Sequence, residues 1–191
     1  MTAQTVKLWN GAEIPLVGLG TWGGWEAKPG EILKAVETAI DVGYRHIDTA
    51  YVYGVEHEVG DAINSKLKDG AVKREELFVV SKLWQKFMAP KDVKPMLLST
   101  LKDLKLEYLD LYLIHKPVPY MNQGDIIPKN ENGDVLFNHD VQHTDTWKEM
   151  EKLVDEGLVK SIGVSNFNHY QVQNILDHCR VKPAVIQVSI F

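Results

Sequence analysis

One unit repeats through most of this 191-residue sequence: a short apolar run, then a segment whose apolar residues recur at helical spacing. Strands that are apolar throughout and alternate with helices are typical of a parallel sheet covered by helices. The chain is therefore predicted to be an α/β protein, with either a doubly wound sheet or a (β/α) barrel. The runs are YRHID (44–48), LFVVSK (77–82), LDLYLIH (109–115), SIGVSN (161–166) and AVIQV (184–188).

The choice between these two architectures depends on the first residues. VKLW, Asn10-Gly11 and AEIPLVGLG predict a β-hairpin with a primed turn. No Gly-x-Gly-x-x-Gly opens a helix after the first run, which favours the barrel. If VGLG is the first barrel strand, Gln187 lies on the sixth, so residues 1–191 are predicted to form a single, incomplete TIM-type barrel domain of about six of eight βα units. Its open sheet edges predict low stability and self-association.

Helix starts can be placed from capping patterns. Thr146 with Glu149 forms a capping box that predicts one helix start, and Asn168 with Gln171 predicts another. A further helix is expected after DTAYVYG, and its charged pairs are interpreted as a solvated face: Glu56, Glu58, Lys66 and Lys68.

Composition excludes several classes of protein. The net charge is -5 and no basic cluster stands out, so nucleic acid is not an expected partner. No stretch approaches the ~20 apolar residues of a membrane span, and the N-terminus lacks the apolar core of a signal peptide, so a cytoplasmic location without membrane association is expected. Cys179 has no second thiol and is interpreted as a packing residue. His139 and His143 have no third ligand, so no metal is proposed.

Each apolar run ends in a polar residue. Barrel enzymes carry their active sites at the carboxyl ends of their strands, so these polar residues are candidates for the site. Asp48, Lys82, His115, Ser165-Asn166 and Gln187 occupy these positions. Tyr53 follows Asp48 by five residues, and its phenol could act as a general acid if a neighbouring ammonium lowered its pKa. These groups are expected to surround one mouth of the barrel.

The sequence resembles the aldo-keto reductases over nearly the whole chain. The segments that carry the resemblance are, in order, LWNGAEIPLVGLGTW, YRHIDTAYVYG, VVSKLW, YLDLYLIHKP, IGVSNF and VIQV. The resemblance implies reduction of aldehydes or ketones by hydride transfer from NADPH, with Tyr53 as the proton donor. It also implies that Lys82 and Asp48 form the ion pair that tunes Tyr53, and that His115 orients the substrate carbonyl.

The same resemblance implies the contacts of the cofactor. Ser165, Asn166 and Gln187 are expected to hold the nicotinamide carboxamide. The nicotinamide riboside is expected beside Asp48 and beside three consecutive residues, Gly20, Thr21 and Trp22.

A pocket for a small carbonyl compound is expected beside these residues. Its expected lining is Trp22, Trp84, His115 and Lys116, with Trp25 and Tyr51 as weaker candidates. The long loop 116–145 is interpreted as a cover over this site.

The sequence departs from the family pattern at two places. Lys116 stands where the family has an aromatic residue, and an inward-facing ammonium there would favour acidic substrates. Ile186 stands where the family has Asn before Gln187, and the chain then ends Val-Ser-Ile-Phe instead of Val-Glu-x-His-Pro. The family binds the 2′-phosphate further on, so NADPH rests on the resemblance alone.

Two other readings compete with a reductase. A non-catalytic barrel, used as a structural or regulatory subunit, would account for the missing strands, which argue for lost activity in this chain. The intact set of polar residues argues against it. An aldolase-like barrel would use Lys82 to form a Schiff base. The parent reductase is expected to be a monomer.

Overall fold

The computed structural model describes residues 4–23 and 28–188. Strands β1 (Thr5–Lys7) and β2 (Glu13–Pro15) form an antiparallel hairpin. The other strands form one parallel sheet in chain order: β3 (Leu19–Gly20), β4 (His46–Asp48), β5 (Phe78–Leu83), β6 (Leu111–Ile114), β7 (Ile162–Ser165) and β8 (Ile186–Gln187). The predicted fold class, an incomplete (β/α) barrel with an N-terminal hairpin, is confirmed.

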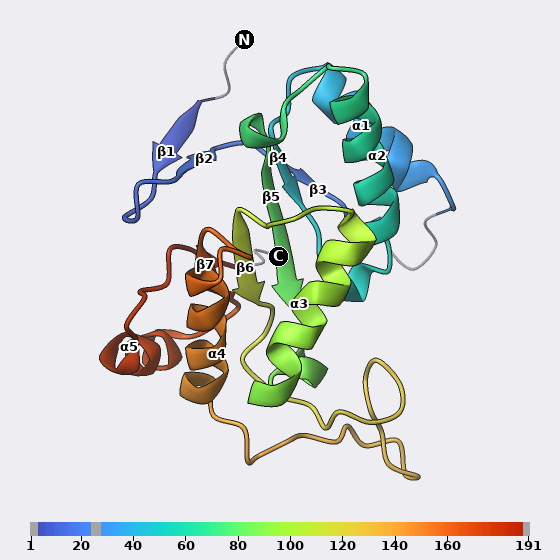
Figure 1. The fold of residues 1–191 in the computed structure, drawn as a ribbon. Coiled ribbons are helices and arrows are strands. Elements are labelled where there is room, and N and C mark those ends of the chain that lie inside the picture. The colour runs from blue at the N-terminus through green and yellow to red at the C-terminus, as the bar shows by residue number, and fades with distance from the viewer. Residues whose placement is uncertain (1–3, 24–27, 189–191) are drawn as a thin grey trace.

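Helices connect successive strands of this sheet. They are α1 (Glu31–Asp41), α2 (Glu56–Lys68), α3 (Pro90–Leu104), α4 (His143–Asp155) and α5 (His169–His178), with single turns η1 (Tyr51–Tyr53), η2 (Arg74–Glu76) and η3 (Gln85–Phe87). The helices pack against one another in chain order on the outer side of the sheet (Figure 1). In the described part of the chain, none is long and apolar enough to cross a membrane.

Alternation along the strands divides the buried side chains into two layers. Val79 and Tyr112 lie in the large cluster between the sheet and the helices. Phe78, Val80 and Leu113 lie in a smaller cluster on the inner face. Because successive side chains point to opposite faces, Ser81 faces the helices while Lys82 faces the inside of the barrel.

The capping prediction is confirmed for α5 and wrong for α4. Asn168 Oδ1 accepts from the backbone N–H of Gln171 at 3.0 Å, and the Gln171 side chain accepts from the Asn168 N–H at 3.0 Å. Helix α4, in contrast, begins at His143. Thr146 lies inside its first turn, fully buried, where its hydroxyl donates to the carbonyl of Met88 at 2.7 Å. A contact with a distant segment has replaced the cap.

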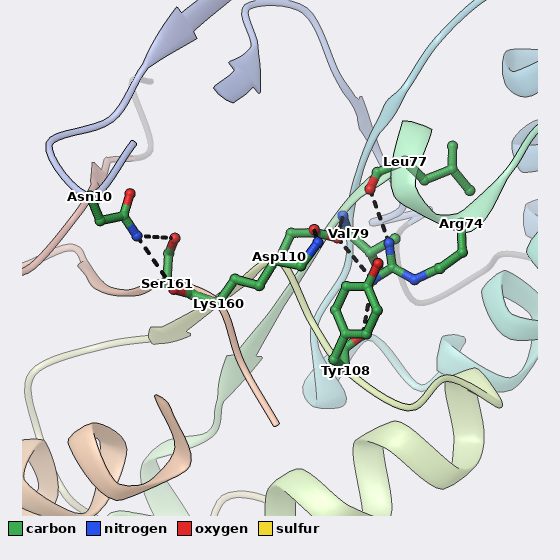
Figure 2. Close-up of polar contacts among 8 residues, drawn as sticks. All are labelled: Asn10, Arg74, Leu77, Val79, Tyr108, Asp110, Lys160 and Ser161. Atoms are coloured by element: carbon green, nitrogen blue, oxygen red, sulfur yellow. Dashed lines mark hydrogen bonds and ion pairs between the residues drawn. The ribbon is translucent and has the colours of Figure 1, made fainter. Parts of the chain in front are cut away.

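The hairpin turn also differs from its prediction. A primed turn needs a left-handed backbone at Asn10, but only Gly11 has a positive φ there, at 88°. The loop closes with the N–H of Leu8 donating to the carbonyl of Ala12. The side-chain amide of Asn10 bonds outside the hairpin: its Nδ2 donates to Ser161 Oγ at 2.9 Å (Figure 2). This contact fixes the hairpin against the start of β7.

Asp110 joins the starts of three strands at the hairpin end of the sheet (Figure 2). Its carboxylate pairs with Arg74 at 2.8 Å and Lys160 at 3.0 Å, and it accepts from the N–H of Val79 at 3.0 Å. Both cations also lie over the Tyr108 ring, 4.0 and 4.2 Å from its centroid. In parallel barrels this end supports stability, whereas chemistry occurs at the carboxyl ends of the strands.

Candidate active site

Polar residues from the ends of five strands, β4 to β8, meet on the inner side of the curled sheet. Asp48, at the end of β4, accepts from Lys82 Nζ on Oδ1 at 2.5 Å and from Gln187 Nε2 on Oδ2 at 2.9 Å. Strands β5, β6 and β7 separate β4 from β8 in the sheet. The sheet must therefore curl for this contact to form, and the curl brings distant strand ends together.

Lys82 is nearly inaccessible, with 1% of its side chain exposed. Its ammonium also donates to the backbone oxygen of Thr49 at 3.0 Å. Burial lowers the pKa of Lys82, and the charge of Asp48 acts in the opposite direction. A buried ammonium is stable only with such partners, so this pair is a fixed feature of the site.

Tyr53, the last residue of η1, lies beside the Lys82–Asp48 ion pair. Its ring centroid is 5.2 Å from Lys82 Nζ, 5.2 Å from the Trp22 ring and 5.7 Å from the His115 ring. Burial, and then the charge of Asp48, raise the pKa of Tyr53 to about 12. The expected lowering of the Tyr53 pKa by an ammonium is wrong for this arrangement, because burial of the ring and the negative charge of Asp48 both raise this pKa. The phenol is therefore protonated at neutral pH and able to donate.

His115 follows β6 and is 8% exposed. Burial, and then the charges of Lys82 and Lys116, lower the pKa of His115 to about 3. The imidazole is therefore neutral, with one ring N–H to donate. Its Nδ1 is buried and has no hydrogen-bond partner in the described part of the chain. The backbone is fixed, since the N–H of His115 donates to the carbonyl of Leu83 at 3.0 Å.

Trp84 connects this site to the long loop, which ends at residue 142 instead of 145. The indole is 5% exposed and meets the His115 ring edge-on, with 5.4 Å between centroids. Its Nε1 donates to the carbonyl of Ile126 at 2.8 Å, and its ring contacts Tyr120 of the same loop. The loop therefore lies beside the site, held by a residue that also contacts His115.

The Ser165-Asn166 pair links the ends of three strands. Asn166 has φ 61°, a left-handed conformation that is uncommon for a residue other than glycine. Its Nδ2 donates to Ser165 Oγ at 2.9 Å and to the carbonyl of His115 at 3.0 Å. Its backbone N–H donates to the carbonyl of Gln187 at 2.9 Å. Such a conformation persists only where surrounding contacts hold it, and it is typical of ligand sites.

The proposed cofactor residues are suited to the nicotinamide end of a dinucleotide. Thr21 Oγ1 is buried with no hydrogen-bond partner in residues 4–23 and 28–188, and the N–H of Thr21 donates to the carbonyl of Asp48 at 2.9 Å. A Cβ placed on Gly20 would meet no atom of these residues within 4 Å, so they leave space over the end of β3. Trp22, 45% exposed, presents an aromatic surface beside this space. These residues combine open space, an unused hydroxyl and an indole.

Some candidate residues are not part of this cluster. Tyr51 packs against Phe87, with 5.3 Å between ring centroids, and belongs to the core. Lys116 is exposed, although its charge reaches His115. Trp25 lies outside the described residues. Cys179 packs against the core, as predicted.

His139 and His143 do not form a metal site with other residues. His139 packs on Phe137, and His143 packs on Phe167 and contacts the carbonyl of Pro117. Within 4–23 and 28–188, no group of three His, Cys, Asp or Glu residues could hold a metal ion.

Two residues that contact β5 beside the site could not be identified from the sequence. The Thr49 carbonyl carries no sequence signal, because any residue supplies a backbone oxygen. Glu56, interpreted as solvated, is 4% exposed and hydrogen-bonded to Ser81 and Thr100. Its position three residues after Tyr53, in the first turn of a helix, is the only signal that could have indicated it.

Comparison with known proteins gives one family. The aldo/keto reductase family model matches residues 16–190. Aldo-keto reductase family 1 member A1 of Gallus gallus is 49% identical over 185 residues, which are 96% of this chain and 55% of that protein. The Homo sapiens protein of the same name is 48% identical over 190 residues, 99% of this chain and 57% of that protein. The chain thus spans little more than half the length of these relatives.

A solved structure gives the same result. The aldose reductase of Schistosoma japonicum superposes with a TM-score of 0.94 at 53% identity, over 98% of this chain and 61% of that one. The fold, the cluster of polar residues at the strand ends and the sequence matches agree. The chain belongs to the aldo/keto reductase family.

Proposed function

We propose that this site reduces aldehydes or ketones to alcohols, with Tyr53 as the proton donor and NADPH as the reductant. The observation that supports this most is the edge-on contact of the Tyr53 and His115 rings, 5.7 Å between centroids, beside the buried Lys82–Asp48 ion pair. A carbonyl oxygen between these two rings would receive two hydrogen-bond donors.

Each residue has a separate task in this proposal. The neutral ring of His115 donates a hydrogen bond to the carbonyl oxygen and so fixes the orientation of the substrate. Tyr53 transfers its phenolic proton to that oxygen as negative charge develops there. Lys82, held by Asp48, stabilises the phenolate that remains. NADPH, when bound, supplies the hydride to the carbonyl carbon.

The cofactor contacts are proposed from the cluster at the ends of β3, β7 and β8. The carboxamide of a nicotinamide would contact Ser165, Asn166 and Gln187, which supply a hydroxyl and two amides. Thr21 has a hydroxyl free to donate. Gly20 and Trp22 would border the riboside.

For the substrate, the proposed pocket is apolar on one side and charged on the other. Trp22 and Trp84 supply aromatic surfaces, and His115 supplies the donor. Lys116 is exposed and lies outside the cluster, but its charge acts on His115 and so favours carbonyl compounds that carry a carboxylate. An aldolase-like role for Lys82 is disfavoured, because an ammonium ion-paired at 2.5 Å lacks the lone pair that attacks a carbonyl.

The first test is titration of the chain with NADPH while its tryptophan emission is recorded. We expect saturable quenching that Trp22→Phe largely removes and that Trp9→Phe, on the hairpin, retains. Quenching that survives Trp22→Phe would place the nicotinamide elsewhere.

The second test is aldehyde reduction by Tyr53→Phe. We expect the rate to fall by roughly 10²- to 10⁴-fold while quenching by NADPH is retained. Near-normal reduction would exclude Tyr53 as the donor. NADPH binding without any reduction by the unaltered chain would favour the non-catalytic relative. The cytoplasmic location stays a prediction. Self-association also stays a prediction, and light scattering tests it by measuring the mass of the particles in solution.

A further inference from the structure

Behind Lys82, on the helix side of the sheet, lies a buried polar cluster that the proposed reaction does not use. Glu56 Oε1 accepts from Ser81 Oγ at 2.5 Å, and Oε2 accepts from Thr100 Oγ1 at 3.1 Å. Glu56, Ser81 and Thr100 are 4%, 0% and 0% exposed. A carboxyl group at the first residue of α2 thus joins that helix to β5 and α3.

These contacts connect the two segments that carry the reactive groups. Glu56 follows Tyr53 by three residues, and Ser81 directly precedes Lys82 in β5. The Glu56–Ser81 hydrogen bond therefore crosses from the Tyr53 segment to the Lys82 strand. The Tyr53 ring and Lys82 Nζ approach to 5.2 Å on the other side of the sheet. A change at the first contact can alter the second, because tightly packed interiors transmit small displacements.

The electrostatic surroundings of Glu56 are mixed. Burial is the main reason that the pKa of Glu56 is raised to about 7, and the charge of Asp103 also raises this pKa. The hydrogen bonds from Ser81 and Thr100 and the charge of Lys82 lower it. Tyr112, opposite Ser81 in the neighbouring strand, has a fully buried hydroxyl with no hydrogen-bond partner among the residues that the structure describes. The pKa of Tyr112 is raised by burial and then by the charge of Glu56. The described groups that contact Glu56 or interact with its charge lie on β5, β6 and α3.

We propose that Glu56 is a positioning residue of this site, whose carboxylate clamps the Tyr53 segment to the Lys82 strand through Ser81, and that protonation of Glu56 loosens the clamp. The inference rests on the proposed function for its effect on the reaction, but the clamp itself can be observed without cofactor or substrate. Charge-assisted hydrogen bonds are roughly twice as strong as neutral ones. Loss of the charge therefore weakens both contacts without removing either partner.

The direct measurement is the ¹³Cζ resonance of Tyr53, assigned with Tyr53→Phe and followed in the unaltered chain from about pH 5 to about pH 9. We expect a step near pH 7, where Glu56 changes charge. Glu56→Gln should abolish the step, because an amide of the same shape does not titrate. Glu58→Gln is the matched control and should retain it, since Glu58 lies on the same helix but accepts from the N–H groups of Gly30 and Leu33.

Ser81→Ala provides a second variant in case Glu56→Gln does not fold. Removing the Ser81 hydroxyl removes a hydrogen bond that lowers the pKa of Glu56, so the step should move to higher pH. A step that persists in Glu56→Gln, that does not move in Ser81→Ala, or that is absent from the unaltered chain would overturn the inference.

Reduction kinetics separate this inference from the proposed function. Above about pH 7, Glu56→Gln should lower kcat roughly three- to tenfold with little change in KM, and below that pH the two proteins should converge. Glu56→Leu, which removes the clamp, should lower kcat by more than tenfold at every pH. Absence of reduction with the Tyr53 step present would reject the proposed function and leave the clamp. If the chain reduces aldehydes but the Tyr53 resonance shows no step with pH, the clamp is rejected and the proposed function stands.

Discussion

Lys82 Nζ lies 2.5 Å from Asp48 Oδ1, with the ammonium almost fully buried and the carboxylate 17% exposed. We expect Lys82→Met to lower the free energy of unfolding by roughly 3 kcal/mol, because it leaves Asp48 without its cation partner. Reduction should be lost as well. Urea unfolding followed by circular dichroism measures the first effect.

Lys148→Met is the control for Lys82→Met, because it removes an exposed partner of Asp145 and should change the unfolding midpoint little. A mild effect of Lys82→Met on both stability and reduction would contradict the role given to the buried pair.

The pH dependence of stability should show two opposing contributions. The pKa of His115 falls to about 3 from its ordinary value of 6.5, so its contribution is present above pH 6.5 and is lost as the pH falls towards 3. The pKa of Glu56 rises to about 7 from 4.5, so its contribution is present below pH 4.5 and is lost as the pH rises through 7. Urea midpoints measured across this range should lose the first slope in His115→Asn and the second in Glu56→Gln. Unchanged slopes would mean that neither group is desolvated as described.

Trp84→Phe should loosen the long loop while keeping most of the aromatic surface. The change removes the hydrogen bond from Nε1 to the carbonyl of Ile126, with a net contribution of about 1 kcal/mol. We expect faster proteolysis within residues 116–142 and a higher KM for carbonyl substrates, with kcat less affected. Trp9→Phe, on the hairpin, is the control, and an unchanged cleavage rate in Trp84→Phe would show that the loop is held by other contacts.

Lys116→Met should change substrate preference rather than fold. The side chain is exposed, and its charge acts on His115. We expect kcat/KM for a carboxylate-bearing aldehyde to fall about threefold to tenfold relative to an uncharged aldehyde of the same size, and the difference to shrink at high salt. Equal losses for both aldehydes would place the ammonium away from the pocket.

The positions at strand ends could be predicted from sequence because periodicity places them. His115 and Gln187 follow apolar runs, and a parallel sheet carries the carboxyl ends of its strands to one side. The same reasoning placed the start of α5 at Asn168, where the cap is formed by residues three apart. Local patterns therefore predicted the fold class and which polar residues stand at the strand ends.

Contacts between distant segments could not be predicted in this way. Thr146 has the pattern of a cap, but its hydroxyl donates to the carbonyl of Met88, which lies 58 residues away in the chain. Glu56 has the composition of a surface residue, but Ser81 and Thr100 reach it only after the helices pack. The pKa of Tyr53 depends on how deeply the ring is buried and on the charge of Asp48 beside it, and the local sequence gives neither.

The docking of the hairpin has a consequence for folding during synthesis. Asn10 contacts Ser161 across 151 residues, and Trp9 Nε1 donates to the carbonyl of Pro183 across 174. Such long-range contacts form late, because a long intervening chain must first be ordered. The hairpin therefore cannot dock until residues 161 and 183 have been synthesised. Until then Leu8 and Ile14, which pack against the inner cluster in the folded protein, stay exposed to chaperones and to other nascent chains.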